Sequence, residues 1–341
     1  MKVNYLIVGQ GIAGTMMAYS LLEAGKTVCV IDSGLPSASS VAAGLFNPVT
    51  GRRFVKSWMI EKLLPHADAV YTGLERLLNI KLLYRKPIVR ILNGDEEKVV
   101  YDRSLTSENQ NYIEGFYGSS SENQYAYCEI KQGGYVDTYS LIHSFRTYLL
   151  NQSCFRLEEF DFDNLIVNAD GIQWKDIEAD EIIFCEGYKA VKNPYFPNLP
   201  FNLAKGEILT LKIPGLNEDK ILMAGAYLVP LGNDIFKLGS TYEWIDLLPE
   251  PTTDGREMLI QKLKAITTLP FEILDHEAGI RPTVKNRRPM LGRHSIYPNL
   301  SILNGMGTKG VLLAPYFGAQ LCEHLVNGEG IDKEVDVRQY M

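Results

Sequence analysis

Residues 5–14 read YLIVGQGIAG, in which a short apolar run precedes the pattern GxGxxG. The apolar run predicts a buried strand, and the apolar stripe of Ala13, Met17 and Leu21 predicts a helix that starts at the glycines. Glycines at this spacing permit a tight turn, close approach of backbone N–H groups to a pyrophosphate, and close packing of the helix on the strand. The segment therefore predicts a Rossmann-like domain that binds a dinucleotide.

An acidic residue stands where such a domain places its ribose contact. A second strand is expected over residues 27–31, and Asp32 follows it, 18 residues after Gly14. A carboxylate at this position accepts hydrogen bonds from ribose hydroxyls. The alternative is a glycine-rich turn with a capping aspartate. Because strand, turn, helix and acid occur together, the nucleotide site is favoured.

The chain departs from a plain NAD-binding sheet directly after Asp32. Residues 33–51 form a loop rich in Ser, Ala, Gly and Pro instead of the next strand and helix. Three strand candidates, residues 205–213, 221–230 and 234–242, indicate a second, antiparallel lobe. The predicted fold class is α/β (α+β), a Rossmann-like domain with an interleaved antiparallel-sheet domain.

The composition sets limits on function. The 341 residues carry 34 basic and 41 acidic side chains, a net charge of −7 that argues against a broad nucleic-acid surface. The five histidines lack paired ligand spacing and no GxSxG motif occurs, so neither a metal site nor a serine hydrolase is predicted. Five cysteines without a CxxC pair indicate reduced thiols and a cytoplasmic protein. Neither a secretory leader nor a membrane segment is expected.

Four further segments, in a fixed order along the chain, resemble the D-amino-acid oxidase family, which includes glycine oxidase and sarcosine oxidase. They are residues 39–48 (SSVAAGLFNP), 180–187 (DEIIFCEG), 227–230 with 238–241 (YLVP and LGST), and 279–282, 289–292 and 304–310 (GIRP, PMLG and NGMGTKG). The resemblance implies an FAD-dependent oxidoreductase. Its expected reaction oxidises the C–N bond of a small amine or amino acid by hydride transfer to flavin N5.

The same resemblance assigns residues to FAD and divides the chain into domains. The expected FAD contacts are Gly9, Gly11, Ile12, Ala13, Gly14, Asp32, Ser33, Ser39, Ser40, Ala43, Gly44, Gly187, Gly305, Gly307, Thr308, Lys309 and Gly310. Residues 1–80, 135–195 and 281–341 are expected to form the FAD-binding domain, and residues 81–134 and 196–280 the substrate-binding domain. Because no cysteine lies near Arg281 or in residues 305–310, FAD is expected to be noncovalent.

Three residues are candidates for acting on the substrate or the flavin. Arg281 matches the family's carboxylate-binding arginine, since a guanidinium offers two parallel donors; the alternative is an ion pair between lobes. Tyr227 is a candidate to hydrogen-bond the substrate or close its pocket, and otherwise a packed strand tyrosine. Lys309 is a candidate to place positive charge near flavin N1, with the backbone N–H groups of residues 307–310, and otherwise a solvated lysine.

The late segment also departs from the family pattern. Residues 284–288 read VKNRR where Thr-Pro-Asp is common, and Met306, Thr308 and Lys309 replace common His, Gly or aromatic residues. The substrate and the electron acceptor, oxygen or another carrier, therefore stay open. So do the roles of Arg52, Arg53, Arg287 and Arg288. After this segment a final helix is expected from about Pro315 to Val326.

Three other functions remain compatible with the sequence. One is an FAD dehydrogenase acting on a hydroxy acid and passing electrons to a carrier. A second is an oxidase acting on a modified tRNA wobble uridine, which the net acidity disfavours. A third is a noncatalytic flavin-binding subunit. Oxygen consumption with peroxide release separates the dehydrogenase from an oxidase, and a flavin spectrum that no substrate bleaches would identify the noncatalytic subunit.

Overall fold

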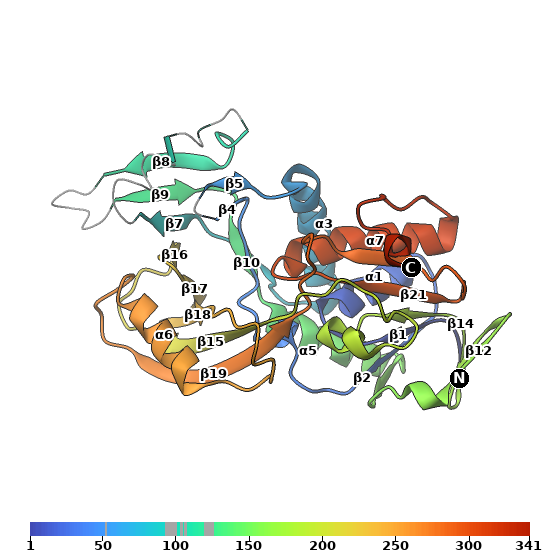
Figure 1. The fold of residues 1–341 in the computed structure, drawn as a ribbon. Coiled ribbons are helices and arrows are strands. Elements are labelled where there is room, and N and C mark those ends of the chain that lie inside the picture. The colour runs from blue at the N-terminus through green and yellow to red at the C-terminus, as the bar shows by residue number, and fades with distance from the viewer. Residues whose placement is uncertain (52, 93–100, 103–104, 106–107, 119–125) are drawn as a thin grey trace.

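The computed structural model describes residues 1–51, 53–92, 101–102, 105, 108–118 and 126–341. The ribbon has two lobes, each built on its own large sheet (Figure 1). The N-terminal strand and the last long helix belong to the same lobe, so the chain leaves this lobe and returns to it (Figure 1).

The sheet of the first lobe is built around two parallel strands, β1 and β14. Its order is β11 (Phe155–Leu157), β2 (Val28–Asp32), β1 (Lys2–Val8), β14 (Ile177–Phe184), β13 (Gly171–Trp174) and β12 (Leu165–Asn168), with β21 (Leu300–Asn304) on β14 and β20 (Met290–Arg293) on β21. Strands β11, β2, β1, β14 and β21 are parallel along this path. Residues 5–8 of β1 are apolar and buried because parallel sheets are covered on both faces.

Helices cover this sheet. They are α1 (Ile12–Glu23), α3 (Ile60–Leu78), α5 (Thr138–Asn151) and α7 (Gly310–Asn327). Helix α7 starts five residues before the expected Pro315. Proline has no N–H, so the carbonyl of Val311 lacks its usual helical donor. The buried hydroxyl of Tyr71 on α3 donates to that carbonyl at 2.8 Å, which lets the helix extend through the proline.

The second lobe contains a mostly antiparallel sheet. Its order is β19 (Glu272–Arg281), β15 (Ala204–Lys212), β18 (Ile235–Gly239), β17 (Tyr227–Gly232), β16 (Ile221–Met223), β7 (Ile88–Ile91), β9 (Tyr127–Ile130) and β8 (Ile113–Tyr117). One face packs on α6 (Thr253–Leu263) through an apolar cluster that includes Leu209, Phe236 and Leu259. Since side chains alternate along strands, the neighbouring positions face the other way.

Short elements complete the fold. They are α2 (Ala38–Val41), the sheet of β3 (Leu45–Phe46), β10 (Gly134–Val136) and β6 (Leu83–Arg85), the pair β4 (Val49–Thr50) and β5 (Val55–Lys56), and the 3₁₀ helices η1 (Phe162–Asn164), η2 (Gly187–Lys192) and η3 (Val337–Tyr340). A Cβ on Gly279 of β19 would lie 3.0 Å from Ala38 Cα, so α2 and β19 are in close contact.

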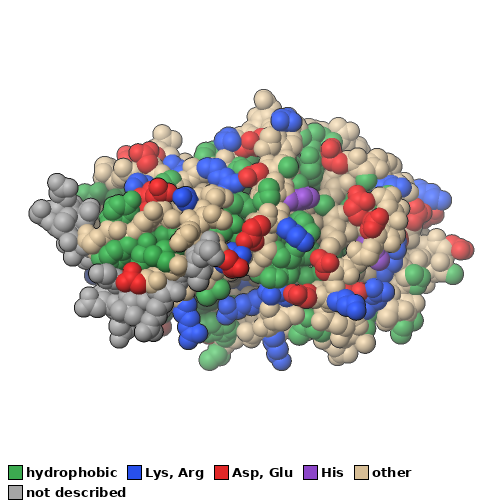
Figure 2. Space-filling model, turned by 90° about the horizontal axis from the view of Figure 1, so that it is seen from above, with side chains coloured by type: hydrophobic (Ala, Val, Ile, Leu, Met, Phe, Trp, Pro, Cys, Tyr) green, Lys and Arg blue, Asp and Glu red, His purple; other side chains and the backbone are tan. Residues whose placement is uncertain are grey.

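The predicted α/β class, with parallel and antiparallel sheets, is confirmed. The strands of the second sheet fall within residues 88–130 and 204–281. The domain boundaries expected from the sequence stay a prediction. In the part of the chain that the structure describes, no helix has the length and apolar character needed to span a bilayer. Basic and acidic side chains are interspersed over the face seen in Figure 2.

Candidate functional site

The glycine turn joins β1 to α1, as predicted. Gly9 has φ +95°, and a Cβ there would lie 2.6 Å from the carbonyl oxygen of Cys185. A Cβ on Gly14 would clash with the carbonyl oxygen of Gly9. Gly11 caps α1 without a side chain. The glycines therefore let the turn pack tightly on itself and on the residue that follows β14, and α1 starts directly after Gly11, where backbone N–H groups are suited to a phosphate.

The Ser/Ala/Gly loop lies against this turn. Ser39 Oγ accepts a hydrogen bond from the backbone N–H of Ile12 at 3.0 Å. Ser40 closes a capping box with Ser37 at the start of α2, so its hydroxyl already has structural partners. Gly44 has φ +64°, and a Cβ there would clash with the carbonyl oxygen of Val136. The loop is held in place by the glycine turn and by β10.

Asp32 ends β2 beside the same turn. Its Oδ2 accepts from the backbone N–H of Gln10 at 2.7 Å, and its Oδ1 accepts from that of Gly34 at 2.8 Å. Arg146 on α5 also donates to Oδ1, at 3.0 Å. The carboxylate is therefore fixed at the carboxyl end of β2, and Ser33 follows it, half-buried.

The late glycine loop, residues 305–310, reaches the same place from the end of β21, which pairs with β14. A Cβ on Gly310 would lie 3.0 Å from Ile12 Cγ2, so this loop touches the start of α1. Asn304 Nδ2 donates to the carbonyl of Gly187 at 3.0 Å, which joins the end of β21 to the turn after β14. Thr308 is exposed. The predicted FAD residues from four segments are thus brought together.

Lys309 is half-buried rather than freely solvated. Its Nζ donates to Ser57 Oγ at 3.1 Å. Burial lowers the pKa of Lys309, and the positive charges of Arg287 and Arg288 lower it further. A cation held here favours negative charge nearby, as the prediction for flavin N1 requires.

The roles of the remaining arginines differ. Arg288 lies 4.0 Å from the ring centroid of Trp58 and pairs with Glu334 at 3.1 Å, which are structural contacts. Arg287 and Arg53 are exposed. Arg52 lies outside the described residues.

These loops fit the dinucleotide part of FAD. They lie at the carboxyl ends of parallel strands, where ligands bind in open α/β sheets. Within the described residues, the buried Thr283 Oγ1 has no hydrogen-bond partner, and it lies 3.8 Å from the Cβ position of Gly307. A polar ligand beside the late loop would supply that partner. No group of three acidic, Cys or His side chains in the described chain is arranged to hold a metal.

Arg281 lies at the end of β19, on the sheet face opposite α6. Its Nη2 donates to Ser240 Oγ at 2.7 Å and to the carbonyl of Thr241 at 3.1 Å, and its Nη1 donates to the carbonyl of Lys205 at 3.2 Å. Among the described residues, no carboxylate lies within ion-pair distance of it. The guanidinium also stacks on Tyr242, with 4.4 Å from Cζ to the ring centroid.

Tyr227 lies on the same face, on β17, three strands away from β19. Its hydroxyl would be 2.8 Å from a Cβ on Gly239, so its ring lies over that glycine. Burial raises the pKa of Tyr227 to about 12, so the phenol is protonated at neutral pH. Ser240, whose hydroxyl accepts from Arg281 at 2.7 Å, also lowers the pKa of Tyr227, against the larger effect of burial. The two predicted substrate residues therefore have Ser240 as a common neighbour.

Most of the chain matches one family of known proteins. Residues 4–324 match the family model described as DAO, FAD dependent oxidoreductase. The chain belongs to this family.

Several relatives align with nearly the whole chain. The tRNA 5-methylaminomethyl-2-thiouridine biosynthesis bifunctional protein MnmC of Leptospira interrogans is 26% identical over 98% of this chain. The chain spans only 59% of that relative's length. Glycine oxidase of Bacillus subtilis is 24% identical, and the match covers 96% of this chain and 95% of the relative.

Solved structures in the DAO family share the fold. Glycine oxidase from Geobacillus kaustophilus has a TM-score of 0.81 at 19% identity, over 97% of this chain and 96% of that one. Iminodiacetate oxidase from Chelativorans sp. BNC1 has a TM-score of 0.79 at 22% identity, over 99% and 98%. The predicted family and the prediction of an enzyme are thereby confirmed.

One buried cation beside the site was not predicted from the sequence. Lys237 on β18 donates from Nζ to the carbonyl of Val41 in α2 at 2.8 Å and lies 3.7 Å from Glu277 Oε2. Burial lowers the pKa of Lys237 and raises that of Glu277. A lysine between apolar strand residues was the available signal, but the sequence does not show which lobe its face meets.

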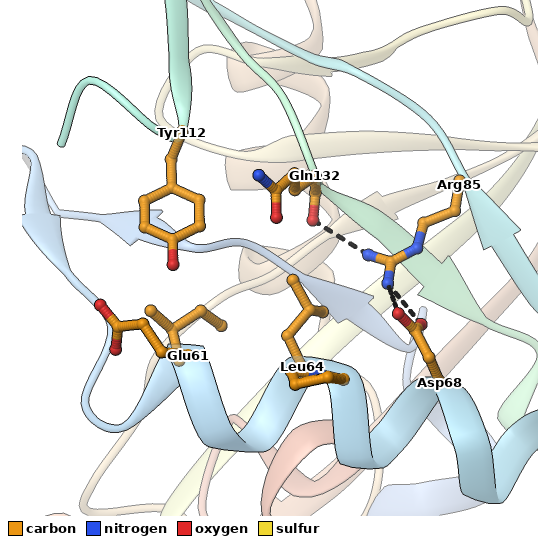
Figure 3. A pocket seen from close by; sticks show the side chains of 8 residues that line it. Glu61, Leu64, Asp68, Arg85, Tyr112 and Gln132 are labelled. Atoms are coloured by element: carbon orange, nitrogen blue, oxygen red, sulfur yellow. Dashed lines mark hydrogen bonds and ion pairs between the residues drawn. The ribbon is translucent and has the colours of Figure 1, made fainter. Parts of the chain in front are cut away.

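The cavity in Figure 3 has a volume of about 560 Å³ and lies apart from these loops. It is lined by Ile60, Glu61, Leu64, Pro65, Asp68, Arg85, Tyr112 and Gln132. Arg85 spans it, bonded to Asp68 on α3 and to the carbonyl of Gln132 (Figure 3). None of the predicted site residues lines this cavity, so it is not the candidate active site.

Proposed function

We propose that this DAO-family enzyme oxidises the C–N bond of a small amine or amino acid and holds FAD noncovalently. The observation that carries the proposal is Arg281. Its guanidinium is bonded only to neutral oxygens among the described residues, and it lies on the sheet face that contacts α2 through Gly279. A positioned guanidinium without a carboxylate partner is suited to bind a substrate carboxylate.

The residues divide the work by position. Residues 9–14 and Asp32 would hold the pyrophosphate and ribose of FAD, and residues 305–310 would hold its ring system. When bound, FAD supplies the hydride-accepting chemistry. Arg281 would orient the carboxylate and Tyr227, a protonated phenol, would donate a hydrogen bond to the substrate. Orientation of this kind supplies much of what a flavoprotein adds to the rate.

Bleaching of the flavin without oxygen, with a panel of amines, amino acids and hydroxy acids, tests the proposal. We expect carboxylated amines to bleach it. In Arg281→Ala the second-order rate constant of flavin reduction should fall, corresponding to an increase of about 3 to 5 kcal/mol in activation free energy. The increase should be smaller in Arg281→Lys. FAD content should be unchanged. Equal slowing of a substrate and its decarboxylated analogue would show that Arg281 is structural.

A modified tRNA nucleoside is the second candidate substrate. It is favoured by the alignment of nearly the whole chain with the Leptospira MnmC protein, whose name refers to a methylaminomethyl thiouridine. That group is itself an amine. Bleaching by tRNA that carries aminomethylated uridine, and not by free amino acids, would select this function.

The electron acceptor and the location of the protein belong to the same proposal. We propose oxygen as the acceptor, to be tested by peroxide release during turnover, and a carrier-linked dehydrogenase is the alternative. All five cysteines are unpaired, which supports a cytoplasmic protein.

A further inference from the structure

Arg146 on α5 connects the two halves of the candidate nucleotide site. Its Nη2 donates to Asp32 Oδ1 at 3.0 Å, and its Nε donates to Gln10 Oε1 at 2.6 Å. Gln10, the second residue of the glycine turn, is 1% exposed, and its Nε2 donates to the carbonyl of Ile142 at 2.9 Å. Helix α5 is therefore bonded to both the turn and the acid that follows β2.

The hydrogen bonds of Asp32 leave little freedom. A carboxylate has about four acceptor positions. Oδ1 accepts from Gly34 and Arg146, and Oδ2 accepts from Gln10. The position that remains is on Oδ2. Arg146 thus occupies the oxygen on its own side and leaves the other oxygen for a ligand.

The guanidinium is held in one orientation. Its Cζ lies 5.3 Å from the ring centroid of Phe155 on β11, and its side chain is 20% exposed. A planar group bonded at Nε and Nη2 and packed on a ring keeps its direction better than an ammonium would. Its positive charge also offsets the repulsion between Asp32 and a nearby pyrophosphate.

We propose that Arg146 is a positioning residue for nucleotide binding. It fixes Asp32 and Gln10 so that the open position of Oδ2 receives a ribose hydroxyl of the adenosine part of FAD. This inference rests on the proposed function, which places Asp32 at that ribose. This role falls outside β2 and the glycine turn, because Arg146 lies on α5, 114 residues after Asp32.

The test measures the rate at which diluted holoenzyme releases FAD, followed by flavin fluorescence. Asp32→Asn and Arg146→Met should each raise the release rate on the order of 10-fold or more, the usual effect of losing a charged hydrogen bond. In the double variant, Arg146→Met should add less than about twofold, because Arg146 acts through Asp32. Arg146→Lys should recover part of the loss.

Arg156→Met is the matched control. Arg156 is on the neighbouring β11 and pairs with Asp176 at the surface, so its loss should leave FAD release unchanged. The positioning role is overturned if the effects of Asp32→Asn and Arg146→Met on the FAD release rate multiply fully in the double variant. It is also overturned if Arg146→Met releases FAD at the wild-type rate. Normal release from Asp32→Asn would instead overturn the proposed ribose site. If Arg146→Met does not fold, the FAD release rate of Arg146→Lys decides. A wild-type release rate in this variant contradicts the positioning role, because a lysine lacks the Nε that donates to Gln10.

Discussion

At the scale of single residues, the site depends on places where a side chain is absent. Arg281 lies over Gly206 of β15, where a Cβ would clash with Nη2. Tyr227 lies over Gly239 in the same way. Both glycines have negative or extended φ, so space rather than backbone conformation requires them. These two large polar side chains lie over the sheet because the residue beneath each of them is a glycine, which has no side chain.

Gly206→Ala is expected to displace the Arg281 guanidinium without removing its charge. The value of kcat/KM for a carboxylated amine should fall about 10-fold or more, through a higher KM. The reason is that a misplaced guanidinium loses one of its two hydrogen bonds to the carboxylate. FAD content should stay at the wild-type level. Steady-state kinetics check this, with Gly330→Ala as control because open space surrounds that glycine. A normal KM would show that Arg281 does not contact the carboxylate.

Glu186 gives the structure a pH dependence. It follows β14, accepts from Asn193 Nδ2 at 2.7 Å, and burial raises its pKa from 4.5 to about 7. A raised carboxyl pKa stabilises the fold below about pH 4.5, and this contribution is lost as the pH rises through about 7. Glu186→Gln should therefore gain stability over wild type between pH 5 and 7.5, on the order of 2 kcal/mol. Urea unfolding at several pH values measures this, and a constant difference would contradict it.

At the scale of elements, a hydrogen bond that helix α7 lacks is replaced by a donor from helix α3. Pro315 removes the donor for the Val311 carbonyl, and Tyr71 of α3 replaces it. The helix can then start at Gly310, which brings the late loop against α1. The packing of α3 on α7 thus determines where residues 305–310 lie.

Tyr71→Phe should destabilise the protein by about 1 to 2 kcal/mol, since a buried carbonyl then has no donor. In a Pro315→Ala background the loss should be smaller, because an alanine at this position restores the helical N–H. Chemical unfolding of the four proteins gives this cycle. Equal losses in both backgrounds would show that the hydroxyl does not act through Val311.

At the scale of the whole molecule, the candidate nucleotide site forms where β1, β2, β14 and β21 end together. Four segments separated by up to about 300 residues contribute to it. The second lobe adds Arg281 and Tyr227 from a different sheet. The candidate substrate site therefore exists only when both lobes are folded and in contact.

Acid or heat treatment of the purified protein should release free FAD into the supernatant. Cys185, the thiol beneath the glycine turn, has its pKa raised by burial, and so do Cys29, Cys128 and Cys322. Protonated, buried thiols are poor partners for covalent attachment. Absorbance of the supernatant and mass spectrometry of the pellet check this. Flavin mass remaining on the polypeptide would contradict it.

The strand, the glycine turn, the helix and Asp32 were predictable from local sequence, because they depend on residue spacing and on where a Cβ is excluded. The sequence also indicated the family through segments in a fixed order. The tertiary structure alone decided the contacts of Arg146 and Lys237. A period-two pattern shows which strand residues share a face, but not which lobe that face meets. Likewise, the periodicity of α5 does not show that Arg146 reaches Asp32, because that contact depends on how α5 packs against β2 and the glycine turn.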